Sequence, residues 1–197
     1  MSENKVLLQE YVDLQYERGT IREQIEKHEP IMLKGIIQRA NAPNANKRIY
    51  PRHILEREIN NYQKLVKENR AVGELDHPSE SVVELKNVSH VLRKVWWEGN
   101  DVMGSLEVLN TPNGKILQSL LDGDIKIGIS SRGVGSLKED GQNNLVEDDF
   151  ILVCFDIVSD PSNFGSFLMK ENVDINQTLR QLTKADRLNR ILNNIIS

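Results

Sequence analysis

The chain has a single cysteine, Cys154, among its 197 residues, so it cannot form an internal disulfide. This scarcity is typical of proteins from a reducing compartment. No apolar run reaches about 18 residues, the length that predicts a membrane-spanning helix. The first residues, Met-Ser-Glu-Asn, lack the basic-then-apolar pattern of a secretory signal. We therefore expect a cytoplasmic protein with no membrane partner.

An excess of positive charge is also missing. The 25 Lys and Arg residues against 29 Asp and Glu give a formal net charge of −4. Charge therefore does not predict nucleic acid as a partner. The phosphate-binding patterns GxGxxG and GxxxxGK[ST] do not occur, so we expect no nucleotide cofactor. With 39% hydrophobic and 27% charged residues, the chain is typical of a globular protein with one sizeable domain.

Hydrophobic spacing predicts a strand-rich centre with helical arms at both ends, 1–30 and 171–197. The central segment, 31–170, is expected to hold the functional domain. The alternation of elements is too irregular for a doubly wound parallel sheet. Within the centre we expect strands over 31–39, 125–136 and 150–158, a hairpin over 82–109, a helix of about four turns from Pro51 to Val66, and a short helix over 113–123.

The strand from Ile125 to Ser136 ends in hydroxyls, an arginine and glycines. A rigid strand can aim a nucleophilic side chain, and nearby glycines let a substrate chain come close. Strict alternation places Ser130 on the face of Lys126 and Gly128, while Ser131 points the other way. On its own this string is more often an ordinary strand end or turn. It becomes a candidate site through residues elsewhere in the chain.

Asp156 lies inside the apolar run Ile151–Val158. A buried carboxylate without partners is costly, so we expect it to pair with donors, an imidazole or backbone N–H groups. Of the four histidines, His77 alone lies in a loop rich in Gly, Pro and Asp, where a side chain can face a cleft. A histidine base, a buried acid and a serine at a strand are the components of a catalytic triad. His77, Ser130 and Asp156 supply them.

Other chemistries fit the sequence less well. Glu74, Asp76, His77 and His90 could ligate a metal, but they match no HExxH or Cys/His spacing. We expect no metal. Cys154 lies mid-strand and is expected to be an inert buried thiol. We expect His90 to be a structural histidine within a strand.

Five motifs give the sequence a resemblance to a known family: NKRIYP at 46–51, GELDHP at 73–78, WWEGNDV at 96–102, GISSRGVGSL at 128–137, and Phe155-Asp156 followed by Pro161-Ser162. In this order and spacing they resemble the prohead maturation proteases of T-even-type tailed phages. The resemblance covers about residues 33–165. It implies an α+β fold like the herpesvirus assemblins, a β-barrel core surrounded by helices.

The resemblance further implies a serine endopeptidase that cuts scaffold and major capsid proteins inside the immature prohead in the host cytoplasm. By motif, His77 is the base and Ser130 the nucleophile. Related proteases use a histidine or an acid as third member, and Asp156 is our choice. Backbone N–H groups around Ser131, Arg132 and Gly133, with the Arg132 guanidinium, are candidates for the oxyanion hole.

The family cuts after glutamate with an aliphatic residue two places earlier. Leu8-Gln9-Glu10 and Ile21-Arg22-Glu23 fit this pattern, so self-processing is predicted near Glu10 or Glu23, although such triplets are common in amphipathic helices. The long arms indicate a role in assembly, and one interpretation is that the protein forms a homo-oligomer. A non-enzymatic capsid-core or scaffold protein is the main alternative. An esterase-type hydrolase is disfavoured, because no GxSxG elbow is present.

Overall fold

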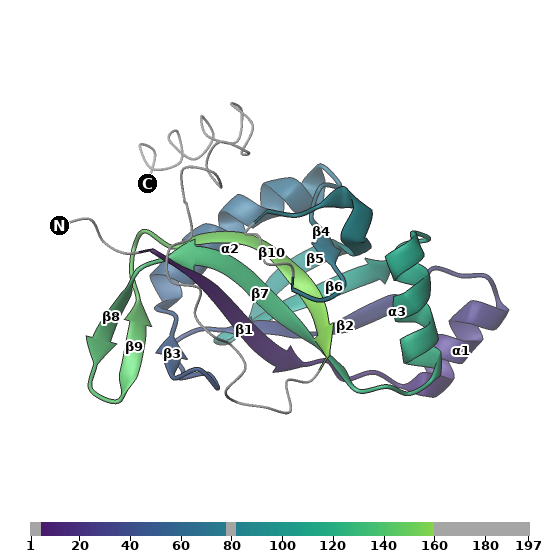
Figure 1. Ribbon diagram of the computed structural model, residues 1–197, viewed down its shortest axis with the longest axis horizontal. Helices are drawn as coiled ribbons and strands as arrows, with labels where there is room; N and C mark the ends of the chain where they lie inside the picture. Colours follow the sequence, from purple (N-terminus) through teal and green to yellow (C-terminus); the bar gives the residue numbers. More distant parts are fainter. Residues whose placement is uncertain (1–4, 78–81, 160–197) are drawn as a thin grey trace.

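The computed structural model describes residues 5–77 and 82–159. It is an α+β structure in which strands predominate (Figure 1). Within these ranges, ten strands form three sheets of three, four and three strands. Three α-helices of the described residues accompany them: α1 (Arg18–Glu26), α2 (Arg52–Lys67) and α3 (Pro112–Asp122). No helix in the described ranges is long and apolar enough to cross a membrane.

The first sheet holds the serine strand. Its order is β1 (Val6–Asp13), β7 (Ile127–Gly135) and β10 (Ile151–Ser159), with β7 antiparallel to both neighbours. Figure 1 shows these three long strands side by side. Every residue of β7 is buried. A strand with partners on both sides and no exposed residue is held firmly in place, which suits it to position a reactive side chain.

The second sheet is antiparallel, in the order β2 (Met32–Arg39), β6 (Asp101–Val108), β5 (Val88–Glu98) and β4 (Val72–Glu74). The predicted hairpin corresponds to β5 and β6. The short helix η1 (Leu85–Asn87) precedes β5. Beyond β4, Leu75 bridges to Ile157 of β10. This bridge brings the end of β4 to the first sheet.

The third sheet is small. It consists of β3 (Arg48–Ile49), β9 (Asn143–Val146) and β8 (Leu137–Asp140). The turn between β8 and β9 contains Gly141 at φ +62°, a conformation that glycine adopts without strain. The hairpin projects from one end of the molecule, and α1 and α3 lie together at the other (Figure 1).

The amphipathic helix α2 packs its apolar side against the sheets. Ile54, Leu55, Ile59 and Tyr62 are buried on it. Glu58 is buried too, and its carboxylate accepts a bond from the Leu152 N–H of β10 at 2.9 Å. The helix therefore holds β10 as well as covering the core.

Two expectations need correction. Residues 6–13 form strand β1 rather than part of a helical arm. Every residue of this segment pairs with β7, and this pairing decides a segment whose hydrophobic spacing fits both a helix and a strand. The described strands also form three separate sheets, not one closed barrel. The predicted arm at 171–197 lies outside the described residues.

Candidate active site

Ser130 and Asp156 are direct partners in the antiparallel pairing of β7 with β10. Paired residues direct their side chains to the same face of a sheet, so the hydroxyl and the carboxylate are neighbours. Neither reaches the surface: the exposed fraction is 1% for Ser130 and 0% for Asp156. Strand pairing therefore fixes two of the three residues that the sequence selected.

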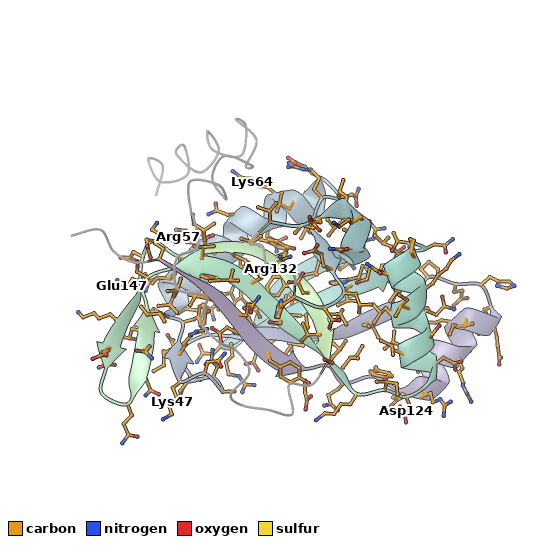
Figure 2. All side chains as sticks on the ribbon, in the orientation of Figure 1. Lys47, Arg57, Lys64, Asp124, Arg132 and Glu147 are labelled. Carbon is orange, nitrogen blue, oxygen red and sulfur yellow. The ribbon has the colours of Figure 1, made fainter. Side chains whose placement is uncertain are left out.

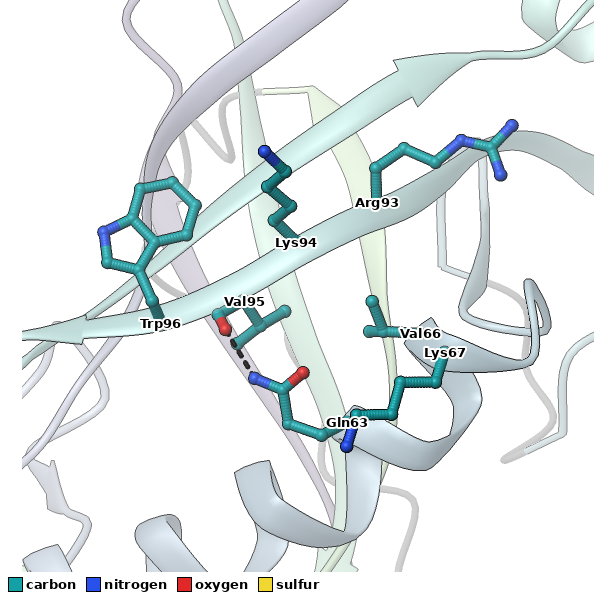
Figure 3. A pocket seen from close by; sticks show the side chains of 7 residues that line it. All are labelled: Gln63, Val66, Lys67, Arg93, Lys94, Val95 and Trp96. Atoms are coloured by element: carbon teal, nitrogen blue, oxygen red, sulfur yellow. Dashed lines mark hydrogen bonds between the residues drawn. The ribbon is translucent and has the colours of Figure 1, made fainter.

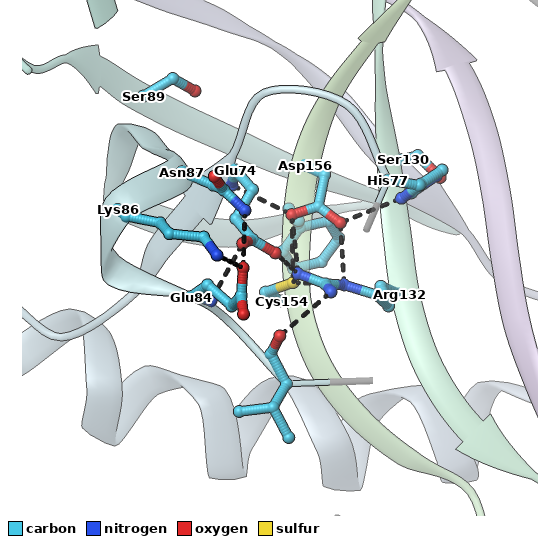
Figure 4. Close-up of polar contacts among 12 residues, drawn as sticks. Glu74, His77, Glu84, Lys86, Asn87, Ser89, Ser130, Arg132, Cys154 and Asp156 are labelled. Atoms are coloured by element: carbon cyan, nitrogen blue, oxygen red, sulfur yellow. Dashed lines mark hydrogen bonds and ion pairs between the residues drawn. The ribbon is translucent and has the colours of Figure 1, made fainter. Parts of the chain in front are cut away.

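His77 lies between these two side chains. Its backbone is held near β10 by a bond of 2.8 Å from the Asp76 N–H to the Ile157 carbonyl. The imidazole Nε2 lies 2.8 Å from Ser130 Oγ, and Nδ1 lies 3.0 Å from Asp156 Oδ2 (Figure 4). An ionised carboxylate only accepts, so the proton belongs on Nδ1 and Nε2 is left to accept from the hydroxyl.

The carboxylate of Asp156 is buried but stays ionised. Burial acts to raise its pKa. The hydrogen bond from His77, the charges of Arg132 and His77, and the Glu74 N–H at 3.0 Å outweigh burial, and the pKa is lowered. A permanent negative charge behind His77 favours the imidazolium form that a proton transfer from Ser130 would create.

Arg132 is a further charged group on this face, two residues beyond Ser130. It is 0% exposed and lies in the middle of the molecule (Figure 2). Its Nε is 2.9 Å from Asp156 Oδ2, and its Nη2 contacts the Glu74 carboxylate. Burial opposes the charge, but Cys154, Asp156 and Glu74 outweigh it and raise the pKa of Arg132. The guanidinium is enclosed by acidic side chains.

This enclosure bears on the expected oxyanion hole. A fully buried guanidinium bound to two carboxylates does not face a position for a substrate carbonyl. Ser131, Arg132 and Gly133 also have strand partners on both sides, in β1 and in β10. The hydroxyl of Ser131 lies on the opposite face from Ser130 and accepts a bond of 2.7 Å from Gln38 Nε2.

The two predicted self-cleavage residues occupy different surroundings. Glu23 is exposed on α1 and pairs with Lys27 at 2.5 Å. Glu10 lies on β1 with an exposed fraction of 1%. Its carboxylate is bound by four side chains of the segment 44–50, described further below.

The remaining candidate residues take structural positions. His90 is buried between Ser89 Oγ and the Phe155 carbonyl, as expected of a structural histidine. Cys154 is buried beside Arg132 and Asp156, and burial raises the pKa of its thiol. Within 5–77 and 82–159, no three side chains of His, Cys, Asp or Glu are placed to hold a metal.

An open groove of about 410 Å³ lies elsewhere, between α2 and β5. It is lined by Gln63, Val66 and Lys67 of the helix and by residues 93–96 of the strand (Figure 3). None of the three candidate catalytic residues lines it. The groove and the His77 site are therefore separate features.

The sequence predicts His77 as a partner of Asp156 but not the other groups that surround this carboxylate. Glu74 was considered only as a metal ligand, and Arg132 only as an oxyanion donor. A signal for Arg132 was present, because strand alternation puts it on the same face as Ser130, where Asp156 also lies. The contact of Glu74 with Arg132 joins β4 to β7, which are far apart in the sequence. No local sequence pattern predicts such a contact.

A hydroxyl, an imidazole and a carboxylate joined in this order are the arrangement of hydrolases with a triad. Comparisons with known proteins agree with a peptidase. Residues 17–189 match the family described as "Prohead core protein serine protease". The prohead core protein protease of Enterobacteria phage T4 is 33% identical over an alignment of 162 residues that covers 79% of this chain and 76% of that protein.

Among solved structures, the bacteriophage T4 capsid assembly protease matches with a TM-score of 0.69 and 27% identity. The match covers 80% of this chain and 99% of that one. The chain therefore belongs to the prohead core protein serine protease family. It is a peptidase of phage head maturation, as the motifs predicted.

Proposed function

We propose that the protein is a serine endopeptidase in which His77, Ser130 and Asp156 form the catalytic triad. It would act inside the immature prohead in the host cytoplasm on scaffold and major capsid proteins, after an aliphatic-x-Glu sequence. The observation that carries the proposal is the pair of contacts at 2.8 and 3.0 Å that joins hydroxyl, imidazole and carboxylate. A non-enzymatic scaffold protein would have no need of this arrangement.

In the proposed mechanism, His77 Nε2 takes the proton of the Ser130 hydroxyl as Oγ attacks the peptide carbonyl carbon. Asp156 holds the ring by its Nδ1–H and stabilises the imidazolium. The proton then passes from His77 to the leaving amine, which leaves an acyl-enzyme on Ser130. Water, activated by His77, releases the acyl group.

The oxyanion that forms in the first step needs donors. We keep the backbone N–H groups near Ser131 and Gly133 as the candidates. In other hydrolases, removing one oxyanion donor typically costs about 10²–10³ in rate. In the described arrangement these residues pair with β1 and β10. Their use would require the β1 side of β7 to become open.

Self-processing at Glu10 or Glu23 is part of the proposal. Cleavage at Glu23 would require α1 to unwind, whereas Glu10 already lies on a strand that pairs with β7. Mass spectrometry of the N-termini of active protein and of the Ser130→Ala form tests both. Identical N-termini in the two proteins would remove self-processing from the proposal.

The decisive experiment compares wild type with Ser130→Ala on a peptide that contains one aliphatic-x-Glu triplet. Wild type should cut the peptide after the glutamate, and Ser130→Ala should be inactive while unfolding at the same temperature. Retention of activity in Ser130→Ala would exclude Ser130 as the nucleophile.

Asp156→Asn should also lose most of the turnover, because an amide favours the wrong imidazole tautomer.

A further inference from the structure

The carboxylate of Glu10 accepts hydrogen bonds from four side chains. Its Oε1 accepts from Arg48 Nη1 at 2.9 Å and from the Tyr50 hydroxyl at 2.7 Å. Its Oε2 accepts from Asn44 Nδ2 at 2.5 Å and from Asn46 Nδ2 at 2.8 Å. An ionised carboxylate has about four acceptor sites, and all of them are used. We call these four donor residues the acid pocket.

The acid pocket is organised by its own backbone. The Asn44 side-chain oxygen accepts from the N–H groups of Asn46 and Arg48, each at 2.9 Å. The Asn44 N–H in turn donates to the Arg48 carbonyl at 3.0 Å. These bonds close the loop and direct the amide nitrogen of Asn44 to the carboxylate without help from Glu10. Burial, followed by the charge of Glu10, raises the pKa of Tyr50, so its hydroxyl remains a donor.

The acid pocket also binds the main chain of β1. Asn46 Nδ2 donates to the Gln9 carbonyl at 2.9 Å as well as to the Glu10 carboxylate. One side chain therefore contacts both the backbone and the acidic side chain of the same extended segment. This combination is typical of a peptide subsite, where main-chain bonds hold the strand and a pocket selects the side chain.

The register of β1 places this segment beside the proposed nucleophile. Glu10 is the partner of Ser131, and Tyr11 is the partner of Ser130. The peptide bond after Glu10 therefore lies alongside Ser130 on β7. Leu8, two residues before Glu10, is completely buried. β1 presents an aliphatic residue, a spacer and a glutamate in the order that the proposed function assigns to substrates.

The position of β1 would allow another strand to replace it. It is an edge strand of its sheet, so another strand could replace it on β7 without rearranging β10. The family match begins at residue 17 and includes residues 44–50, whereas β1 ends at Asp13. The acid pocket thus lies in the shared part of the chain, and its occupant lies outside it.

We propose that the acid pocket is the subsite for a glutamate side chain of a substrate peptide, and that β1 fills the substrate channel in this structure. This proposal rests on the proposed function. In the described state Ser130 is 1% exposed, and β1 pairs along the length of β7. A substrate strand that replaces β1 would take its place along β7. β1 is thus a competitor of substrate.

Binding to the inactive Ser130→Ala chain tests the inference without catalysis. The probe is the octapeptide Val-Leu-Leu-Gln-Glu-Tyr-Val-Asp, the sequence of residues 6–13, and its analogue with Gln in place of Glu. The glutamate peptide should bind the double variant Ser130→Ala/Glu10→Gln about tenfold or more tightly than Ser130→Ala, because the internal competitor has lost its charge. The Gln analogue should bind this double variant about tenfold more weakly than the glutamate peptide.

A further substitution tests the role of Arg48 in this preference. Adding Arg48→Gln to the double variant should remove the preference for glutamate over glutamine. The matched control is Arg39→Gln in the same background. It makes the same charge change at a residue that pairs with Asp101 and should leave the preference intact. A ratio of two affinities does not depend on how much of the protein is folded. Equal binding of the two peptides to the double variant Ser130→Ala/Glu10→Gln would overturn the inference.

Hydrogen exchange tests whether the peptide displaces β1, without any substitution in the acid pocket. Saturating peptide on Ser130→Ala should speed amide exchange in 6–13 while β10 keeps its protection. Unchanged protection of 6–13, or no binding of the peptide at all, would overturn the proposal. The two proposals fail separately: activity in Ser130→Ala would refute the triad, whereas loss of the glutamate preference concerns only the acid pocket.

Discussion

Arg132 and Asp156 face each other across β7 and β10 through two contacts, Nε to Oδ2 at 2.9 Å and Nη2 to Oδ1 at 3.2 Å. Both side chains are completely buried. The same guanidinium contacts Glu74, so one cation balances two buried acids. The position of Asp156 behind His77 therefore depends on Arg132 as well as on the strand.

Replacing Arg132 should damage both stability and activity. Arg132→Met leaves two buried carboxylates without their cation, and breaking a buried pair typically costs about 3–5 kcal/mol of unfolding free energy. Arg132→Lys keeps a positive charge but loses the two-point contact with Asp156. We expect it to recover part of the stability and to lower kcat more than it raises KM. Urea unfolding and peptide kinetics measure the two effects.

The pH profile of Arg132→Lys separates positioning from simple structural support. Weaker contact with the cation raises the pKa of Asp156, which must stay ionised for catalysis, so the acid limb of kcat/KM should move to higher pH. Arg22→Lys is the control, since Arg22 pairs with the exposed Asp122 on the surface and should change neither stability nor the profile appreciably. An acid limb in Arg132→Lys identical to wild type would contradict a positioning role.

Ser131→Ala should leave catalysis intact. Its hydroxyl lies on the opposite face from Ser130 and accepts from Gln38 Nε2. Removing it leaves a buried amide donor without that partner, which costs about 1–3 kcal/mol of stability. We expect a lower unfolding temperature with kcat/KM close to wild type. If Ser131→Ala abolished cleavage while Ser130→Ala retained it, the assignment of the nucleophile would be reversed.

The elements predicted from the sequence are those whose signal is local. α2 and α3 have apolar residues at helical spacing, and β7 and β10 are apolar runs of strand length. β1 was mistaken for a helix, because its spacing fits both structures and its partner, β7, lies more than a hundred residues away. Only the tertiary pairing decides such a segment.

The site was predictable in its chemistry but not in its surroundings. A buried acid in an apolar strand requires partners, and a loop histidine is one that can reach it. The direct pairing of Ser130 with Asp156 depends on the register of β10, which shifts between Leu152 and Cys154. An irregularity of this kind has no signature in hydrophobic spacing. The acid pocket likewise joins residues from separate elements.

His90 should make the protein acid-sensitive. It is buried and neutral, and desolvation lowers its pKa from 6.5 to about 4, although Asp156 and the Phe155 carbonyl act in the opposite direction. Below about pH 6.5 the unfolded chain binds a proton there that the folded chain does not. Stability from this group is therefore complete above pH 6.5 and is lost as pH falls towards 4, by roughly 3 kcal/mol.

Unfolding free energies of wild type and His90→Gln between pH 4 and 8 check this expectation. The variant should be less stable than wild type at pH 8, and the difference should shrink as pH falls. Carboxylates that lose pairing in acid affect both proteins alike, so the difference isolates the histidine. A difference that stays constant with pH would show that His90 titrates equally in both states.

Gly73 should tolerate no side chain. A Cβ there would lie 2.0 Å from the Phe155 carbonyl oxygen and 2.4 Å from His90 Nε2, far inside van der Waals contact. Because the Phe155 oxygen belongs to the backbone of β10, relief requires β4 to move away from that strand. Gly73→Ala should cost about 1–3 kcal/mol of stability and should reduce kcat, because His77 lies only three residues after the end of β4. Thermal unfolding and peptide cleavage measure these effects.

Gly19→Ala is the matched control for this substitution. Gly19 lies in α1, and a Cβ there would have nothing within 4 Å. Alanine at a helical position favours the folded state by up to about 1 kcal/mol over glycine. The same chemical change should therefore raise the unfolding temperature at Gly19 and lower it at Gly73, with activity lost only at Gly73. Full activity in a folded Gly73→Ala protein would mean that the close contact of β4 with β10 does not position His77.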